Sequence, residues 1–226
     1  MHQPSEPAIL YFGTPVILVS TRNRDGDANI APISSVFWLG WRCVIAMSPT
    51  SKTSENLLRE RECVVNIPCA DMVDAVDRLA LTTGSDPVPE NKARRGYVHH
   101  ADKFALAGLT PAASETVLAP RVRECQVQLE CKLVSTRRLG EGEPDMALGA
   151  CVFELRVTRV WIDTAILADG QTNRVDPDKW RPLMMSFQKF YGLGPQAAPS
   201  RLASIPEHMY RGPDIDRARR EPTRAD

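Results

Sequence analysis

The chain has 226 residues, and its 28 Lys and Arg residues balance 28 Asp and Glu residues, so the formal net charge at pH 7 is zero. This balance argues against a nucleic-acid partner and against an anionic membrane surface, because both normally require an excess of basic residues. Hydrophobic residues make up 43% of the chain and charged residues 25%, which is the composition of a globular protein. The 18 prolines disfavour a helical bundle or solenoid, because proline interrupts helices.

The cysteines and the chain start predict a cytoplasmic protein. The six cysteines contain no C-x-x-C pair, and residues 1–10 lack a basic segment followed by an apolar run. No uninterrupted apolar stretch of about 18 residues occurs, so we expect no membrane span. In a reducing compartment the cysteines would pack as small hydrophobic side chains.

The first part of the chain is typical of antiparallel strands. Residues 16–21 are apolar and β-branched, and the Asp25-Gly26 pair that follows predicts a hairpin. Residues 28–39 form the return strand, and Pro32 within it indicates an edge, a bulge or a backbone left free. With a third strand over residues 42–47, the pattern predicts a three-stranded meander.

Two helices and a strand are expected next. A hydroxyl-rich loop leads into a short helix over residues 55–62, with Ser51 or Thr53 as its N-cap. Residues 63–67 read as a strand that ends at Pro68, and apolar residues from position 71 to 80 follow helical spacing.

The second half of the chain is dominated by two long strands. Residues 82–114 show no single periodic pattern, and we expect one or two helical turns at 90–96. Residues 125–133 alternate strictly between apolar and polar side chains, as in a strand with one buried face. A turn over residues 140–144 joins them to a strand from residue 151, in which the apolar phase shifts near Arg159 and predicts a bulge. The charged tail from Gly212 is expected to be mobile.

These elements predict a mainly β protein, an antiparallel β-barrel with helical insertions. We divide the chain into an N-terminal arm (1–12), one barrel domain (13–195) and a C-terminal extension (196–226).

Common catalytic and metal-binding motifs do not occur in the sequence. It contains no G-x-S-x-G, H-E-x-x-H, Walker or G-x-G-x-x-G motif, and the four histidines have no metal-ligand spacing. We therefore assign no catalytic acid, base or nucleophile and no metal site.

Two polar segments are candidates for ligand binding. Four hydroxyls and one ammonium precede the first predicted helix and suit a phosphate: Ser48, Thr50, Ser51, Lys52 and Thr53. The alternative is a capped helix with a solvated loop. In the second segment, Ser34 and Ser35 follow Pro32. Proline has no N–H to donate to a neighbouring strand, so backbone groups near it are available to bind a flat polar ligand. Its alternative is an ordinary edge strand.

In this order and spacing, the two segments resemble the flavin reductase-like family of FMN-binding split barrels. The resemblance rests on N-I-A-P-I-S-S-V-F at 29–37, T-S-K-T-S-E-N-L at 50–57 and C-V-V-N-I at 63–67. It continues through L-E-C-K-L at 129–133, V-W-I-D at 160–163, I-L-A-D-G at 166–170, P-L at 182–183 and F-Y-G at 190–192, and covers roughly residues 10–195. The chain departs from the family with W-L-G-W at 38–41, where a proline-containing turn is frequent, and with Trp161, where His is common.

The resemblance implies a homodimer with FMN near each subunit interface. It assigns the FMN phosphate to the hydroxyl loop, with Asn56 nearby, and the isoalloxazine ring to a second set of residues: Ala31, Pro32, Ser34, Ser35 and Val36. NADH or NADPH would then donate hydride to FMN, and oxygen, a metal chelate or a separate monooxygenase would accept the electrons.

Two other functions compete with this interpretation. One is a non-catalytic FMN-binding module that serves as a flavin store, a sensor or a protein with a structural cofactor. The other is a heme-binding split barrel, which is disfavoured because no histidine occupies an obvious axial position.

Overall fold

A computed structural model describes residues 1–143 and 149–224. Pro144, the last residue of the turn predicted at 140–144, lies outside the described residues. The last two positions of the C-terminal extension also lie outside them.

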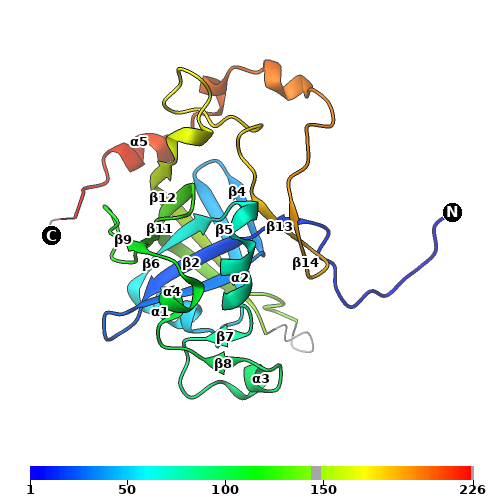
Figure 1. Cartoon of the computed structure of the whole chain (residues 1–226), viewed down its shortest axis with the longest axis vertical. Helices are drawn as coiled ribbons and strands as arrows, with labels where there is room; N and C mark the ends of the chain where they lie inside the picture. Colours follow the sequence, from blue (N-terminus) through cyan, green and yellow to red (C-terminus); the bar gives the residue numbers. More distant parts are fainter. Residues whose placement is uncertain (144–148, 225–226) are drawn as a thin grey trace.

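The core of the molecule is a curled, antiparallel, seven-stranded sheet that forms a half-barrel (Figure 1). Its strands, in spatial order, are β3 (Ala28–Ile33), β2 (Ile17–Arg22), β6 (Glu62–Ile67), β11 (Val127–Arg138), β12 (Cys151–Ile162), β5 (Arg42–Met47) and β4 (Val36–Leu39). The prediction of a mainly β, antiparallel barrel with helical insertions is confirmed.

Strand β2 is buried on both faces. Ile17 and Val19 point into the barrel, where they join a core with Ile45, Phe153 and other side chains. The alternate residue Leu18 belongs to a second apolar cluster on the outer face, which the helices complete. This double burial explains why the strand reads as a continuous apolar run.

The predicted meander is wrong in its geometry, although its strand pairs are right. β3 pairs with β2 and β4 pairs with β5, but β3 and β4 stand at opposite edges of the sheet. Ser34 and Ser35 interrupt the expected long strand between them, and the backbone oxygen of Ser35 accepts from the amide of Ala46 (2.9 Å). These two residues therefore connect the two edges of the curled sheet.

The helices are short and lie outside the barrel. Helix α1 starts earlier than expected, and the predicted second helix divides into a 3-10 turn and α2. The α-helices are α1 (Lys52–Glu60), α2 (Val73–Leu79), α3 (Glu90–Ala93), α4 (Lys103–Ala107) and α5 (Pro213–Arg219), and the 3-10 turns are η1 (Ala70–Met72), η2 (Thr164–Ile166), η3 (Arg201–Ser204) and η4 (Glu207–Tyr210). Val76 and Leu79 of α2 and Phe104 of α4 cover the outer cluster on β2 and β3.

The long hairpin of β11 and β12 carries the predicted bulge. Glu130 pairs with Arg159 while Cys131 pairs with Val157, so β12 contains one extra residue beside Arg159. A second register shift lies between Leu133 and Ser135.

Three small sheets surround the half-barrel. β1 (Thr14–Pro15), β13 (Leu183–Ser186) and β14 (Lys189–Gly192) form one; β9 (Pro111–Ala112) pairs with β10 (Arg121–Val122); and β7 (Thr82–Thr83) runs parallel to β8 (Val98–His99). The β13–β14 hairpin lies beside the N-terminal arm, where the amide of Phe187 donates to the backbone oxygen of Tyr11 (2.9 Å).

The tail that we expected to be mobile contains helix α5, which packs against β12. Ala218 is buried, and Asp214 accepts a hydrogen bond from Arg42 (2.7 Å). Before this helix, residues 193–211 arch over the end of the barrel and are exposed throughout (Figure 1).

Candidate functional site

A cavity of about 410 Å³ lies where the two edges of the sheet meet. Seven of the eleven predicted site residues line it: Ala31, Pro32, Ser34, Ser35, Ser48, Ser51 and Thr53. Its volume falls in the usual range of small-molecule sites, about 300–1,000 Å³. The two polar segments that the sequence singled out therefore face the same space.

The hydroxyl loop is held in place by its own hydrogen bonds. Ser51 caps helix α1 by accepting from the amide of Ser54 (3.0 Å), which decides between the two predicted N-caps. Ser54 in turn donates to the backbone oxygen of Ser48 (2.7 Å), while the Ser48 hydroxyl bonds that of Thr50 (3.0 Å). The loop is therefore shaped before any ligand arrives.

The start of α1 supplies backbone donors to the cavity. The first two amides of the helix, those of Lys52 and Thr53, have no residue four positions earlier within the helix to accept from them. The capping bonds in the described loop satisfy the amides of Ser54 and Glu55 instead. Together with the helix dipole, the two remaining amides attract an anion.

The opposite wall is the corner at Ser34 and Ser35. β3 lies at the sheet edge, as Pro32 indicated, so one side of its backbone pairs with no other strand of the described chain. The Ser35 hydroxyl bonds the hydroxyl of Tyr11 (3.0 Å), which brings the N-terminal arm to the mouth of the cavity. This wall suits a flat ligand with polar edges.

Sequence reasoning missed the cationic wall, which comes from the mixed segment 82–114. Lys92, Arg95 and Tyr97 line the cavity, and no Asp or Glu does so among the described residues. The ammonium of Lys92 lies 3.4 Å from the Thr83 hydroxyl and 5.5 Å from the centre of the Tyr97 ring. Burial lowers the pKa of Lys92. The signal that could have identified this wall is the basic run N-K-A-R-R-G-Y at 91–97.

Four predicted residues do not line the cavity. Val36 is buried in the barrel core, and Thr50 is exposed. The ammonium of Lys52 pairs with Glu55 (3.0 Å), and buried Asn56 donates to Asn23 (2.8 Å). Asn56 thus ties α1 to the β2–β3 turn, while Lys52 lies at the start of α1.

A strained residue, Leu81, stands at the cavity mouth. It has a positive φ of 54° and is 52% exposed, although leucine disfavours this conformation. Strain of this kind concentrates at functional sites.

A second cavity of about 380 Å³ adjoins the first and is more apolar. The two share part of their walls, including Tyr11, Pro32 and Tyr97, and the second adds Val16, Met185 and Phe190. A ligand with a polar and an apolar part therefore has adjoining space for both.

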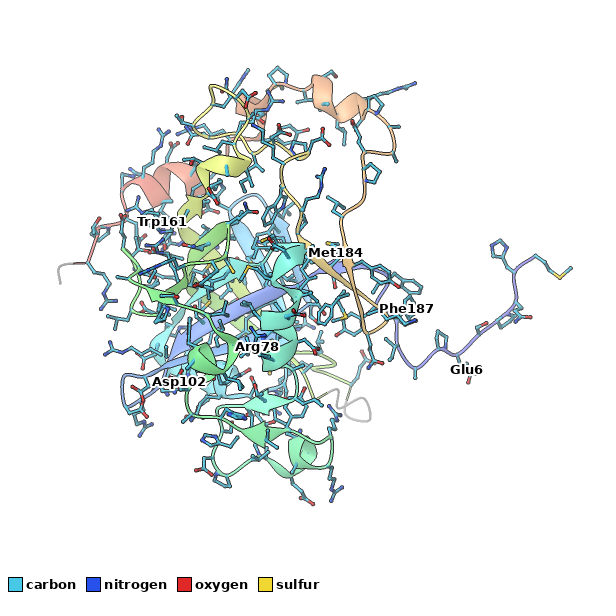
Figure 2. All side chains as sticks on the ribbon, in the orientation of Figure 1. Glu6, Arg78, Asp102, Trp161, Met184 and Phe187 are labelled. Carbon is cyan, nitrogen blue, oxygen red and sulfur yellow. The ribbon has the colours of Figure 1, made fainter. Side chains whose placement is uncertain are left out.

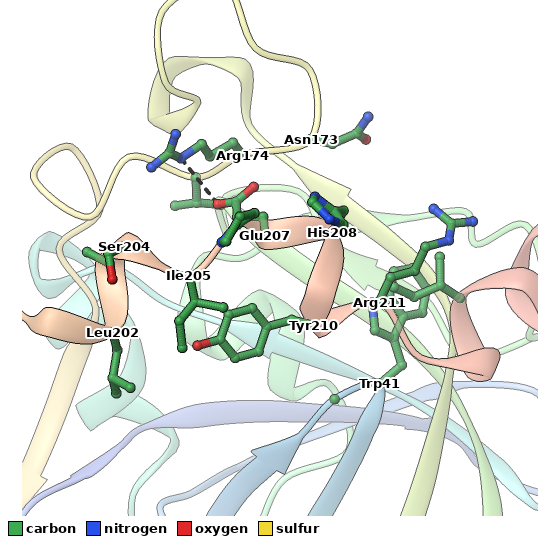
Figure 3. A pocket seen from close by; sticks show the side chains of 15 residues that line it. Trp41, Asn173, Arg174, Leu202, Ser204, Ile205, Glu207, His208, Tyr210 and Arg211 are labelled. Atoms are coloured by element: carbon green, nitrogen blue, oxygen red, sulfur yellow. Dashed lines mark ion pairs between the residues drawn. The ribbon is translucent and has the colours of Figure 1, made fainter.

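A larger cavity, about 980 Å³, lies elsewhere, between Trp41 and the C-terminal extension (Figure 3). Arg174 and Glu207 form an ion pair across it (3.2 Å). None of the predicted site residues lines it. We place the candidate site in the cavity of about 410 Å³, because the capped start of α1 lies there together with Lys92 and Arg95 and with no acidic side chain among the described lining residues.

Trp161, one of the two departures from the family pattern, is remote from the candidate site. It donates to buried Glu130 (2.7 Å), and the Arg121 guanidinium stacks 3.8 Å above its ring. Figure 2 shows it across the molecule from Met184 and Phe187, which lie on the β13–β14 hairpin. Its role in the described structure is to complete the environment of Glu130.

The described parts of the chain contain neither a metal-binding cluster nor a membrane-spanning helix. No three His, Cys, Asp or Glu side chains gather as a metal site there, and no helix there has the length and apolarity needed to span a membrane.

Comparisons with known proteins agree with the fold. The model of the flavin reductase like domain matches residues 9–194. A Bacillus subtilis relative, the uncharacterized protein YdfE, is 35% identical over 189 residues, which are 84% of this chain and 88% of the relative.

Two solved structures share the fold. Flavoredoxin of Desulfovibrio vulgaris (Miyazaki F) has a TM-score of 0.72 at 23% identity and covers 91% of this chain and 100% of its own. Nitrilotriacetate monooxygenase component B from Bacillus cereus has a TM-score of 0.66 at 22% identity, with 85% and 89% coverage. The family model spans most of the chain, and the resemblance seen in the sequence is confirmed: the protein belongs to the flavin reductase-like family and has a flavin-related function.

Proposed function

We propose that this protein is an FMN-dependent oxidoreductase that transfers hydride from NADH or NADPH to FMN. The observation that carries the proposal is the cavity itself, in which a capped helix start and uncompensated cations face a corner of free strand backbone. Because the family establishes a flavin, an anion-binding end favours a phosphorylated one.

The residues of the cavity divide into two groups by role. Ser48, Ser51, Thr53 and the first amides of α1 would hold the phosphate, with Lys92 and Arg95 opposite. Ser34, Ser35 and the free edge of β3 would bond the polar edge of the ring system, which gains negative charge on reduction. Bound FMN would supply the two-electron acceptor.

The chain need not provide an acid or a base for this reaction. Hydride transfer requires two stacked rings at the right distance, so the protein contributes orientation and a face left open. The adjoining apolar cavity, walled by Tyr97 and Phe190, provides that space for the nicotinamide.

We further propose a homodimer, supported by apolar side chains exposed around the site. Leu10 and Phe12 of the arm, Phe187 and Tyr191 of the β13–β14 hairpin, and Phe37 of β4 are all 44% or more exposed. The rings of Phe12 and Phe187 stack edge to face, with their centres 5.0 Å apart. Exposed apolar surface of this kind usually marks an interface. Light scattering on the purified protein should give about twice the 25.1 kDa chain mass.

The electron acceptor is proposed by analogy of fold. Nitrilotriacetate monooxygenase component B shares this architecture, so we propose that reduced flavin is passed to a monooxygenase component. The six free cysteines suit a reducing compartment, and we propose the cytoplasm as the site of action.

A flavin titration followed by a turnover assay tests the function. The purified protein should quench FMN fluorescence on binding and should oxidise NADH or NADPH when FMN is present. The double variant Ser51→Ala, Thr53→Ala should bind FMN more weakly while Thr172→Ala, an exposed residue in the 171–174 loop, should not. Binding without turnover would instead support the non-catalytic flavin module, and absence of flavin binding would refute both.

A further inference from the structure

One residue of the N-terminal arm belongs to the candidate site, although most of the arm does not. Tyr11 lines both the cavity of about 410 Å³ and the adjoining apolar cavity. Residues 1–8 are exposed throughout, and Glu6 lies away from the body of the molecule (Figure 2). The arm therefore becomes part of the site only where the chain reaches Tyr11.

The β13–β14 hairpin holds the backbone of Tyr11 in place. The backbone oxygen of Tyr11 accepts from the amide of Phe187 (2.9 Å) and from the hydroxyl of Ser186 (3.4 Å). Phe187 and Gln188 have positive φ values of 45° and 64°, as a two-residue hairpin turn of type I′ requires. The ring of Phe12 packs edge to face on that of Phe187. The turn of this hairpin therefore fixes the end of the arm at the mouth of the cavity.

The hydroxyl of Tyr11 is held by the wall that we assign to the flavin ring. It lies 3.0 Å from the hydroxyl of Ser35, which lines the same cavity. Among the described residues, Tyr11 is the sole hydrogen-bond partner of the Ser35 hydroxyl. A hydroxyl has one proton and two lone pairs, so Ser35 can accept from one group while it donates to another.

The direction of this hydrogen bond decides where the proton of Ser35 points. A phenol is a stronger proton donor than an aliphatic alcohol, so the favoured arrangement has Tyr11 donating and Ser35 accepting. The proton of Ser35 is then left for a different acceptor, and the cavity that Ser35 lines contains the proposed ligand. Without Tyr11 the Ser35 hydroxyl would rotate freely, and its proton would have no fixed direction.

We propose that Tyr11 is a positioning residue that directs the proton of Ser35 at the flavin ring and so favours the reduced flavin. The hydride of the proposed reaction brings two electrons and one proton to FMN and leaves the nicotinamide oxidised, so the ring gains one negative charge. A donor already aimed at that charge stabilises reduced FMN more than oxidised FMN. This inference rests on the proposed function, because it takes the ligand of the cavity to be a flavin.

The test measures how much more tightly the protein binds reduced FMN than oxidised FMN. Anaerobic isothermal titration calorimetry gives both dissociation constants, and their ratio is the measured quantity. In Tyr11→Phe the preference for reduced FMN should fall about three- to tenfold, the size of one hydrogen bond. For a two-electron couple, this change equals about 15–30 mV in the reduction potential of the bound flavin. The substitution removes one hydroxyl and keeps the ring and the backbone bond to Phe187.

Two further variants show whether Tyr11 acts through Ser35. Ser35→Ala should lower the preference for reduced FMN by itself, and adding Tyr11→Phe should then change nothing more, because no serine proton is left to direct. Tyr210→Phe is the matched control. This tyrosine lies in η4 of the C-terminal extension, is 61% exposed and should keep the wild-type ratio when its hydroxyl is removed.

The possible results separate this inference from the proposed function. If Tyr11 only anchored the arm, Tyr11→Phe would increase hydrogen exchange over residues 9–13 and keep the wild-type ratio; that result would overturn the inference and leave flavin binding intact. An equal loss from Tyr11→Phe with and without Ser35 would also overturn it, because the effect would not pass through the serine. A wild-type protein that binds neither form of FMN would refute both proposals.

Discussion

Glu221 anchors the end of the C-terminal extension to the barrel, and replacing it by Gln tests that anchoring. Its carboxylate accepts from Arg156 of β12 (3.1 Å) and from Lys132 of β11 (2.5 Å). The Arg156 and Glu221 side chains are only 7% and 11% exposed. The substitution keeps the size of the side chain and removes its charge.

The expected loss follows from the burial of this pair. Breaking a buried ion pair typically costs about 3–5 kcal/mol, because the remaining charge is left without a partner. Here α5 can detach and let water reach Arg156, so the loss cannot exceed the free energy with which the extension docks. We therefore expect Glu221→Gln to lower the free energy of unfolding by about 2–3 kcal/mol. For a chain of this size that is a fall in melting temperature of about 4–12 °C.

Urea denaturation at pH 7, followed by tryptophan fluorescence, measures this loss. Asp216→Asn is the matched control, because it lies on α5, just before Glu221 in the same extension. Asp216 pairs with Arg211, the two side chains are 55% and 39% exposed, and the loss should stay below about 1 kcal/mol. Hydrogen exchange should increase over residues 213–224 in Glu221→Gln. Equal stabilities and equal exchange in the two variants would refute the docked extension.

The pH dependence of the same variant has a definite sign. Burial alone would raise the pKa of Glu221, but hydrogen bonds from Lys132 and Arg156 hold that pKa below its ordinary value. The stabilisation is therefore present above the unfolded-state pKa, near 4.5, and is lost as the pH falls through the lower folded-state pKa. The difference between wild type and Glu221→Gln should shrink in strong acid.

Three further predictions concern other parts of the chain. Burial lowers the pKa of Lys103 of α4 to about 8 in the folded protein, so unfolding takes up a proton between pH 8 and 10.5. The stability of the wild-type protein relative to Lys103→Met should therefore rise with pH in that range, by up to about 3 kcal/mol, as denaturant titrations would measure. Gly84→Ala should lose about 1–3 kcal/mol of stability and weaken FMN binding, because its Cβ would meet Asn29, while Gly194→Ala, with open space around it, should change neither. Four of the six cysteines are buried, and Cys69 donates to Asp71, which leaves Cys151 as the most accessible thiol. Alkylation of the native protein at pH 8 should therefore label Cys151 first, as peptide mass spectrometry would show. Labelling of a buried thiol before Cys151 would contradict the core packing.

The local parts of the site could be predicted because their signals are local. Ser51 precedes a helix by the spacing that a cap requires, and Pro32 in a strand pattern indicates an edge. Lys92 and Arg95 could not be placed, because the segment between β7 and α4 has no periodicity and its position depends on contacts with α1, such as that between Gly84 and Lys52. Asn56 and Val36 lie next to cavity residues in sequence but turn inward, which only the fold decides.

The strands were predictable and the curvature of the sheet was not. Alternation along β11 and the phase shift at Arg159 gave the long hairpin and its bulge. Nothing in residues 28–39 distinguishes one long strand from two strands at opposite edges, because that choice depends on β6, β11 and β12 filling the space between them. Helix α5 lacks an apolar stripe and is held by charged partners far away in sequence, such as Arg42.

The junction at Ser34 and Ser35 also has a consequence for synthesis of the protein. The proposed flavin contacts all lie within the first hundred residues, yet the cavity exists only when β3 and β4 are brought together around the curled sheet. That sheet includes β12, which ends at Ile162. A nascent chain that has emerged only as far as residue 150 therefore carries every contact residue and no binding site, and the flavin can enter only after roughly three quarters of the protein has been made.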